Sequence, residues 1–257
     1  MNISDSRKVY LKRIKKEKNF ILLFRFLILV LFLLGWEVLA RLEFINTFTF
    51  SSPSRVITTL INLFNEGILF KHIGVSLYEI LICFIISCGI GLLVSSILWS
   101  NFVLSKIVEP YLTVLNSLPK VALGPLIIIW VGASTNSIIF MALLISTFIT
   151  IINIYNSFIS TDKNYVTLLK SFGANKWQVF RKVILPSNFK NIISALKINI
   201  SMNLIGVIMG ELLVSKSGIG YLIMYGSQVF NIDLVIAGVF ILGIISYLMY
   251  FIVDRFE

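Results

Sequence analysis

Charged side chains inside long apolar runs are the residues of this sequence best placed to do chemistry. Glu211 and Lys120 both fall within such runs. If the runs cross a membrane, each charge is costly unless it is paired or wetted, so each is a candidate for lining a polar pathway. Glu211 could instead be an interfacial residue bonded to backbone in the glycine-rich turn at 218–220. For Lys120, the pathway and a structural role remain equally open.

Amide side chains form a second candidate group. They lie on two later apolar runs, and such groups often bond one membrane helix to another. Packing is therefore favoured over solute contact, although we keep Asn203 as a pathway candidate. Lys197 lies about two turns inside its run, from where it can extend its amine to the interface. The amides are Asn153, Asn156, Asn199 and Asn203.

Residue patterns for enzyme chemistry are missing from the sequence. It has no phosphate-binding G-x-x-x-x-G-K-[ST] loop and no nucleophile–base or metal-ligand cluster. His72 is the single histidine and follows Lys71, so we expect a loop residue. Cys83 and Cys88 share one apolar run and are expected to be buried thiols. We therefore predict no catalytic residue, no metal and no cofactor.

The elements that must position these residues are membrane helices. The chain of 257 residues is 58% hydrophobic and only 13% charged, and its apolar residues fall in long runs. A helix of about 20 apolar residues crosses a hydrocarbon core of ~30 Å. The sequence predicts an all-α membrane protein with six spans, at about 20–40, 73–99, 107–132, 136–160, 191–214 and 234–253. A basic segment over residues 1–19 precedes the membrane domain of residues 20–257.

Lysine and arginine indicate the orientation of these spans. With the N-terminus inside, fifteen basic residues lie on the cytoplasmic side and four on the other, while three fall within spans. Cytoplasmic loops carry such an excess, so we predict that both termini are cytoplasmic. The third span is unusual because it contains Pro110, Pro119 and Pro125, which should bend or break it. This break could be a packed kink or a segment that lines a pathway.

The loop between the fourth and fifth spans, at about 162–186, predicts two short amphipathic helices. Tyr165, Leu168, Leu169 and Phe172 recur at helical spacing, and Gly173 is placed to end the helix in a left-handed turn. The second helix presents Trp177, Phe180 and Ile184 on one face, and Pro186 is expected to stop it. Such a loop could lie on anionic lipid or fit a groove on a cytoplasmic partner.

The loop also resembles a known family. Gly173, Val183 and Leu185-Pro186 have the spacing of the loop signature of binding-protein-dependent ABC permeases, although Thr167, Leu168 and Leu169 stand where that signature has Glu-Ala-Ala. The wider chain is similar to the nitrate, sulfonate and taurine branch. The supporting stretches are Pro53-Ser-Arg55, Ser117–Leu126, Trp130-Val-Gly132, Gly206–Glu211 and Ser217–Leu222.

The resemblance implies the role of each part. The loop would dock on a separate ATP-binding subunit through Leu169, Phe172, Gly173, Ala174 and Trp177. It further implies a homodimer in a bacterial cell membrane, an external substrate-binding protein, and a small solute such as a sulfonate, a nitrate-like anion or a vitamin precursor. In this branch a basic residue often stands where this chain has Glu79, which could bear on substrate charge or lie at the outer interface.

Three other classes of protein fit the sequence less well. A self-sufficient secondary carrier often shows paired repeats and several mid-membrane charges. This sequence shows no repeat, and Lys120 alone is a plausible mid-depth charge. If the protein were only a membrane anchor, the proline-broken span would have no evident role. A membrane-embedded enzyme is disfavoured because the sequence has no nucleophile–base or metal-ligand cluster. Nucleic acid is not expected as a partner, because the basic residues follow the membrane boundaries.

Overall fold

The computed structural model describes residues 3–255, and every regular element in that range is helical. The chain divides into two compact units, Met1–Asn62 and Leu63–Glu257. The sequence division at residues 19 and 20 stays a prediction, and residues 1, 2, 256 and 257 lie outside the described part of the chain.

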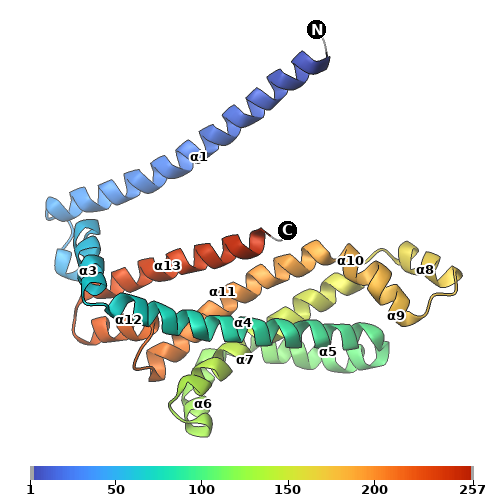
Figure 1. Cartoon of the computed structure of the whole chain (residues 1–257). Coiled ribbons are helices and arrows are strands. Elements are labelled where there is room, and N and C mark those ends of the chain that lie inside the picture. The colour runs from blue at the N-terminus through green and yellow to red at the C-terminus, as the bar shows by residue number, and fades with distance from the viewer. Residues whose placement is uncertain (1–2, 256–257) are drawn as a thin grey trace. The chain divides into compact units, whose positions relative to one another are not determined.

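The first unit consists largely of one long helix. Helix α1 covers Ile3–Arg41 and is followed by α2, Thr47–Phe50, and by the start of α3, Pro53–Asn65 (Figure 1). None of the most apolar window of α1 is buried. Two bonds made by Glu37 order the end of this unit, from Arg41 Nε at 2.7 Å and from the Ser54 backbone N–H at 3.0 Å. A helix that exposes apolar side chains all round suits a lipid environment.

The core of the second unit is formed by α4 (Ile68–Ser100), α7 (Thr135–Ile159) and α11 (Phe189–Val214), which pack against one another (Figure 1). Glycines on α11 allow its close approach to α7. A Cβ added at Gly206 would lie 2.5 Å from Ala142 Cα, and one at Gly210 would lie 2.9 Å from Ile138 Cα. Small residues let membrane helices pack backbone to backbone, since the hydrophobic effect does not hold helices together within lipid.

The remaining helices flank this core. Helix α12 (Ile219–Gln228) packs on α13 (Ile232–Asp254), and both contact α11. On another side, α5 (Phe102–Ser117) and α6 (Gly124–Val131) contact α7. Five helices of the described chain are long and apolar enough to cross a membrane, or six if α5 and α6 together count as one span. The predicted all-α fold is confirmed, with each predicted span overlapping one of these helices.

The predicted interruption of the third span is a sharp bend of 80° between α5 and α6. Pro119 causes it, because the residue before a proline avoids helical backbone and Leu118 is extended at ψ 140°. A 3₁₀ turn over Lys120–Leu123 follows. The other two prolines do not break a helix. Pro110 lies inside α5, and Pro125 lies in the first turn of α6, where a missing N–H is tolerated.

Candidate functional site: the α8–α9 loop and the buried polar groups

The loop at 162–186, called here the α8–α9 loop, is ordered by local caps. Helix α8 covers Lys163–Ser171, and the Asp162 side chain accepts the Asn164 N–H at 2.8 Å. Gly173 has a left-handed backbone at φ +77°. The Gly173 N–H bonds to Lys170 O at 2.9 Å and the Ala174 N–H to Leu169 O at 3.1 Å, which is the Schellman arrangement. The predicted left-handed turn is therefore present at Gly173.

The second helix of the loop differs from the prediction at its end. Helix α9, Lys176–Val179, starts at an Asn175–Gln178 capping box with two bonds of 2.8 Å. It continues through the π turn η2, Phe180–Ile184, into α10, Leu185–Ser187. The expectation that Pro186 stops this helix was wrong. Pro186 lies in the first turn of α10, where it needs no N–H partner, and the helical path is interrupted only at Asn188, whose ψ is 9°.

The apolar side chains of the loop divide into two sets. One set packs inward: Leu169 and Ala174 lie against a buried cluster that includes Val179, Phe180 and Ile184. The other set faces outward. We call it the exposed ridge; its members and their exposed fractions are Tyr165 58%, Leu168 52%, Phe172 80% and Trp177 66%. The predicted coupling residues therefore form two groups. Phe172 and Trp177 are exposed and available to a partner, whereas Leu169 and Ala174 pack the turn against the buried cluster.

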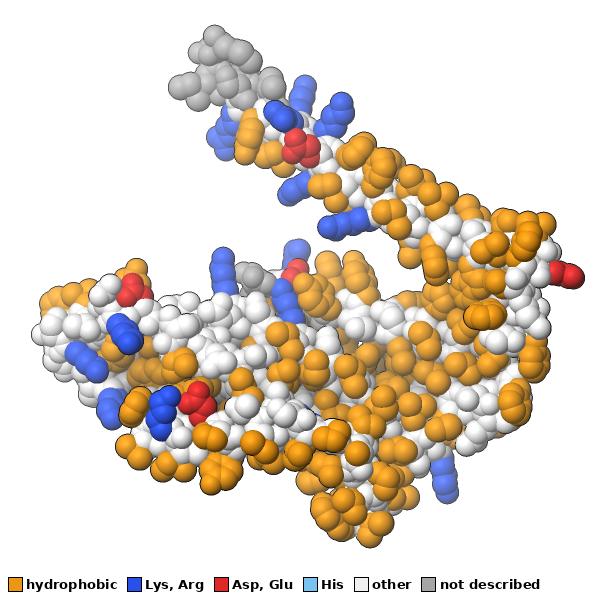
Figure 2. All heavy atoms as spheres, turned by 180° about the vertical axis from the view of Figure 1, so that it is seen from behind, with side chains coloured by type: hydrophobic (Ala, Val, Ile, Leu, Met, Phe, Trp, Pro, Cys, Tyr) orange, Lys and Arg blue, Asp and Glu red, His pale blue; other side chains and the backbone are white. Residues whose placement is uncertain are grey.

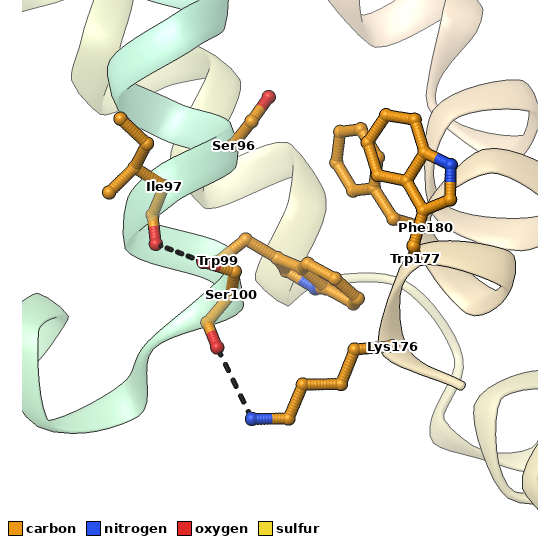
Figure 3. Close-up of a pocket in the computed structure, with 7 residues that line it drawn as sticks. All are labelled: Ser96, Ile97, Trp99, Ser100, Lys176, Trp177 and Phe180. Carbon is orange, nitrogen blue, oxygen red and sulfur yellow. Dashed lines mark hydrogen bonds between the residues drawn. The ribbon is translucent and has the colours of Figure 1, made fainter.

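A pocket lies between this loop and the end of α4 (Figure 3). Its volume is about 350 Å³, and it is lined by Ser96, Ile97, Trp99, Ser100, Lys176, Trp177 and Phe180. Phe180 is stacked near Trp177, with ring centroids 5.9 Å apart. The Lys176 amine reaches the Ser100 carbonyl oxygen at 3.5 Å. These contacts connect the loop to the end of α4, which is one of the core helices.

Basic side chains surround the exposed ridge. Lys163, Lys170 and Lys176 are exposed on the loop itself. Figure 2 shows Lys and Arg side chains gathered toward the end of the second unit that carries α8 and α9, while hydrophobic side chains cover much of its length. A partner that binds here would meet apolar side chains bordered by positive charge.

The predicted pathway residue Lys120 lies at the bend between α5 and α6. Its amine donates to Asn116 O at 3.0 Å and to Asn116 Oδ1 at 3.2 Å, and it lies 5.8 Å from the centre of the Phe148 ring. The side chain is half-buried. The backbone carbonyl and the side-chain amide of Asn116 thus hold this amine beside one aromatic face, and part of the side chain remains exposed.

The second pathway candidate, Asn203, is fully buried within the chain. Its amide donates to Asn199 Oδ1 at 2.6 Å and to Ser87 Oγ at 3.1 Å, and Asn199 in turn donates to Thr150 Oγ1 at 2.5 Å. This network joins α4, α7 and α11, so Asn199 and Asn203 bond helix to helix as predicted. Asn203 Oδ1 has no hydrogen-bond partner within the described residues.

The third candidate, Glu211, is buried at the opposite end of α4 from the loop. Its carboxylate accepts the Ser76 hydroxyl at 2.5 Å and the Gly220 N–H at 2.6 Å. A Cβ added at Gly218 would lie 2.4 Å from Glu211 Cδ, so the turn before α12 packs directly against this carboxyl group and has no space for a side chain there. The predicted backbone bond to the 218–220 turn is therefore present. It is made from a buried position, with Glu211 only 1% exposed.

Sequence reasoning missed two neighbours of Glu211. His72 is buried rather than in a loop: its Nδ1 accepts the Gly218 N–H at 2.9 Å. Ser76 Oγ accepts the Ile219 N–H at 2.8 Å. With Gly220 bonded to Glu211, three successive N–H groups at the start of α12 have side-chain partners. The i, i+4 spacing of His72 and Ser76 on α4 was the available signal.

The loop and the Glu211 cluster lie at opposite ends of the membrane-spanning core. From Ser76 to Ser100, α4 runs 24 residues, which at 1.5 Å per residue is about 36 Å. A hydrocarbon core is ~30 Å thick. The α8–α9 loop and the start of α12 are thus positioned near opposite membrane surfaces.

Comparison with known proteins agrees with this architecture. Residues 87–257 match the family described as binding-protein-dependent transport system inner membrane component. The chain belongs to this family, the permease subunits of ABC importers, and is a multi-pass membrane protein that serves translocation rather than catalysis.

Relatives along most of the chain carry related descriptions. A probable ABC transporter permease protein of Haemophilus influenzae is 30% identical over 228 residues, 89% of this chain and 92% of that protein. The formylaminopyrimidine transport permease protein ThiX of Halalkalibacterium halodurans is 28% identical over 86% of this chain and 88% of its own. The putative aliphatic sulfonates permease SsuC of Bacillus subtilis is 27% identical over 82% of this chain and 76% of its own.

A solved structure shares the fold. An inward-facing MetNI methionine ABC transporter chain aligns with 72% of this chain and 94% of its own length, with a TM-score of 0.62 and 19% identity. This likeness supports the type I importer fold.

Proposed function

We propose that this chain forms, as a homodimer, the pathway through which a small solute enters a bacterial cell, driven by a separate ATP-binding subunit. An external substrate-binding protein would deliver the solute. The relatives named for formylaminopyrimidine and aliphatic sulfonates support a vitamin precursor or a sulfonate as the solute class, and a nitrate-like anion remains a prediction.

The exposed ridge is the observation that carries this proposal. Large apolar side chains at Phe172 and Trp177 are 80% and 66% exposed on a loop that is otherwise well packed and capped. Aromatic anchors of this kind dominate binding energy when a partner buries them. Since the inner face of the same loop packs against the body and contacts the end of α4, the loop is suited to transmit movement of a bound ATPase.

Within the loop we assign two roles. Phe172 and Trp177, together with Tyr165 and Leu168, would contact the ATPase directly. Leu169, Gly173 and Ala174 would fix the turn that presents them, because they form the Schellman turn and its inward contacts. The loop, both termini and the basic segment over residues 1–19 would lie in the cytoplasm, as the distribution of basic residues predicts.

The pathway roles of Lys120, Asn203 and Glu211 remain predictions. Lys120 is the strongest of the three, because it is half-exposed at the bend between α5 and α6. Asn203 and Glu211 are buried in this conformation, so they would reach a solute only if their helices separated during transport.

Co-purification tests the proposal. The full chain is expressed with its candidate ATP-binding subunit, and Phe172→Ala and Trp177→Ala are compared with wild type. Phe102→Ala is the matched control, because Phe102 is 73% exposed on α5, outside the loop. Each ridge variant should lose binding by at least tenfold, the scale of an aromatic anchor, while the control retains it. Equal retention by all three variants would contradict docking at the ridge.

A further inference from the structure

Glu79 is a buried carboxyl group that the proposed transport function does not use. Its side chain lies on α4 and is 0% exposed. Neither Oε1 nor Oε2 has a hydrogen-bond partner within the described residues. A buried ionised carboxylate with no partner is strongly disfavoured, so an additional positive group or a proton is required at this position.

The neighbour of this group is the carboxylate of Glu211. Ser76 and Glu79 are one turn apart on the same buried face of α4, and Ser76 bonds directly to Glu211. Helices α4 and α11 pack against each other at this level, so Glu79 is a neighbour of the Glu211 side chain. Glu79 and Glu211, called here the carboxyl pair, therefore bring two acidic groups together in the interior of the protein.

The two members of the pair have different surroundings. Glu211 accepts a hydroxyl at 2.5 Å and a backbone N–H at 2.6 Å from the first turn of α12, where the positive end of the helix favours an anion. Neither Glu79 oxygen has a hydrogen-bond partner among the described residues, although the Thr135 side chain at the start of α7 lies near enough to interact with it. The arrangement favours the negative charge on Glu211 and a neutral form of Glu79.

The groups packed around the pair supply no compensating cation. On α4, His72 bonds to Gly218 and Cys83 lies a turn beyond Glu79, while the nearest lysine, Lys71, is exposed. On α12, Tyr221 stacks on His72, with ring centroids 5.7 Å apart. Helix α7 carries no charged residue, and Glu211 is the facing charge on α11. No group of three metal-ligating side chains occurs among the described residues.

We propose that the carboxyl pair is a proton-binding site, in which Glu79 holds one proton and donates it toward the Glu211 carboxylate. Binding forms one O–H bond on Glu79 and takes the proton from water, so the pair keeps a single negative charge. Loss of the proton leaves two adjacent carboxylates and no cation between them. The ligand is thus H⁺ at a site beside the first turn of α12.

The site connects protonation to the joint between α4, α11 and α12. The bonds from Gly220 to Glu211 and from Ile219 to Ser76 hold the start of α12 against both other helices. Repulsion within a doubly charged pair would push α4 from α11 at this joint. We therefore expect proton loss to loosen the end of the protein opposite the α8–α9 loop.

Infrared spectroscopy of the purified full-length chain tests the proposal directly. A protonated carboxylic acid gives a carbonyl band separate from the amide and carboxylate bands. At neutral pH the wild type should show this band, and Glu79→Gln should lack it. Glu66→Gln, at an exposed glutamate before α4, should keep it. A wild type without the band, or a Glu79→Gln variant with the band undiminished, would overturn the proposal.

Thermal unfolding gives a second test that does not need the glutamine variant. If the folded state holds one more proton than the unfolded chain, its folded-to-unfolded ratio falls by up to tenfold per pH unit as pH rises. Glu79→Arg, which replaces the proton by a fixed cation, should remove this component of the slope. A slope equal in wild type and Glu79→Arg, or stabilisation of the wild type by sodium over choline at constant pH, would overturn proton binding.

Discussion

The left-handed turn at Gly173 offers the sharpest perturbation of the α8–α9 loop. Gly173 has φ +77°, and a Cβ added there would have no heavy atom within 4 Å. Substitution therefore adds no clash and acts through backbone conformation alone. A left-handed backbone costs a residue with a Cβ about 1–2 kcal/mol, and a β-branched valine belongs at or above the upper end of that range.

This cost translates into a measurable loss of affinity. A shift of 1–2 kcal/mol in the loop's conformational equilibrium corresponds to a factor of about 5–30. If the ATPase binds only the native loop, Gly173→Val should weaken its binding by about that factor. Gly173→Asn should retain most of the affinity, because asparagine tolerates this conformation best among residues with a Cβ.

The assay is the binding of the ATPase subunit to permease in lipid nanodiscs, together with ATP hydrolysis stimulated by the loaded binding protein. Gly67→Val is the matched control: Gly67 has φ +71° and the same open surroundings, but it lies just before α4 at the end of that helix away from the loop. Unchanged affinity in Gly173→Val, or an equal loss in Gly67→Val, would refute the reasoning.

Three further predictions follow from other parts of the structure. A cysteine introduced at the exposed Lys176, in a chain with Cys83 and Cys88 replaced, should react with a membrane-impermeant thiol reagent only after the cells are opened. Labelling in intact cells would contradict the predicted cytoplasmic position of the loop. Gly206→Leu should abolish stable folding, because a Cβ at this position would lie 2.5 Å from Ala142 Cα in the backbone of the packed helix α7. Gly89→Leu should fold, because no heavy atom lies within 4 Å of a Cβ added at Gly89. Equal yields of folded protein from the two variants would contradict this packing. Lys120→Leu should reduce solute uptake at least severalfold while ATPase co-purification is unchanged, and uptake equal to wild type would remove Lys120 from the pathway.

The spans were predictable from the sequence because a membrane helix must satisfy its own backbone and therefore needs a long apolar run. The turn at Gly173 was predictable from the local sequence. A left-handed backbone conformation favours glycine, so Gly173 after the apolar helical pattern predicted the end of α8. Pro186 does not stop this helix, because a π turn over Phe180–Ile184 precedes the proline and places it in the first turn of α10, where its missing N–H is tolerated.

The inward and outward sides of the loop could not be read from periodicity alone. Leu168 and Leu169 are adjacent leucines on the same broad apolar face, yet Leu168 is 52% exposed and Leu169 packs inward. The position of the core decides between them, and that position depends on contacts with distant helices. Burial of Glu79 is likewise a tertiary property, since its neighbour Glu211 is on another helix and far along the chain.

Reconstitution in proteoliposomes tests the central claim most directly. Permease, ATPase and binding protein would be combined, and uptake of the binding protein's ligand would be followed with and without ATP inside the vesicles. We predict uptake only when all three proteins and ATP are present, and loss of that uptake when Phe172→Ala and Trp177→Ala are combined. Accumulation of solute by vesicles that contain this chain alone would contradict it.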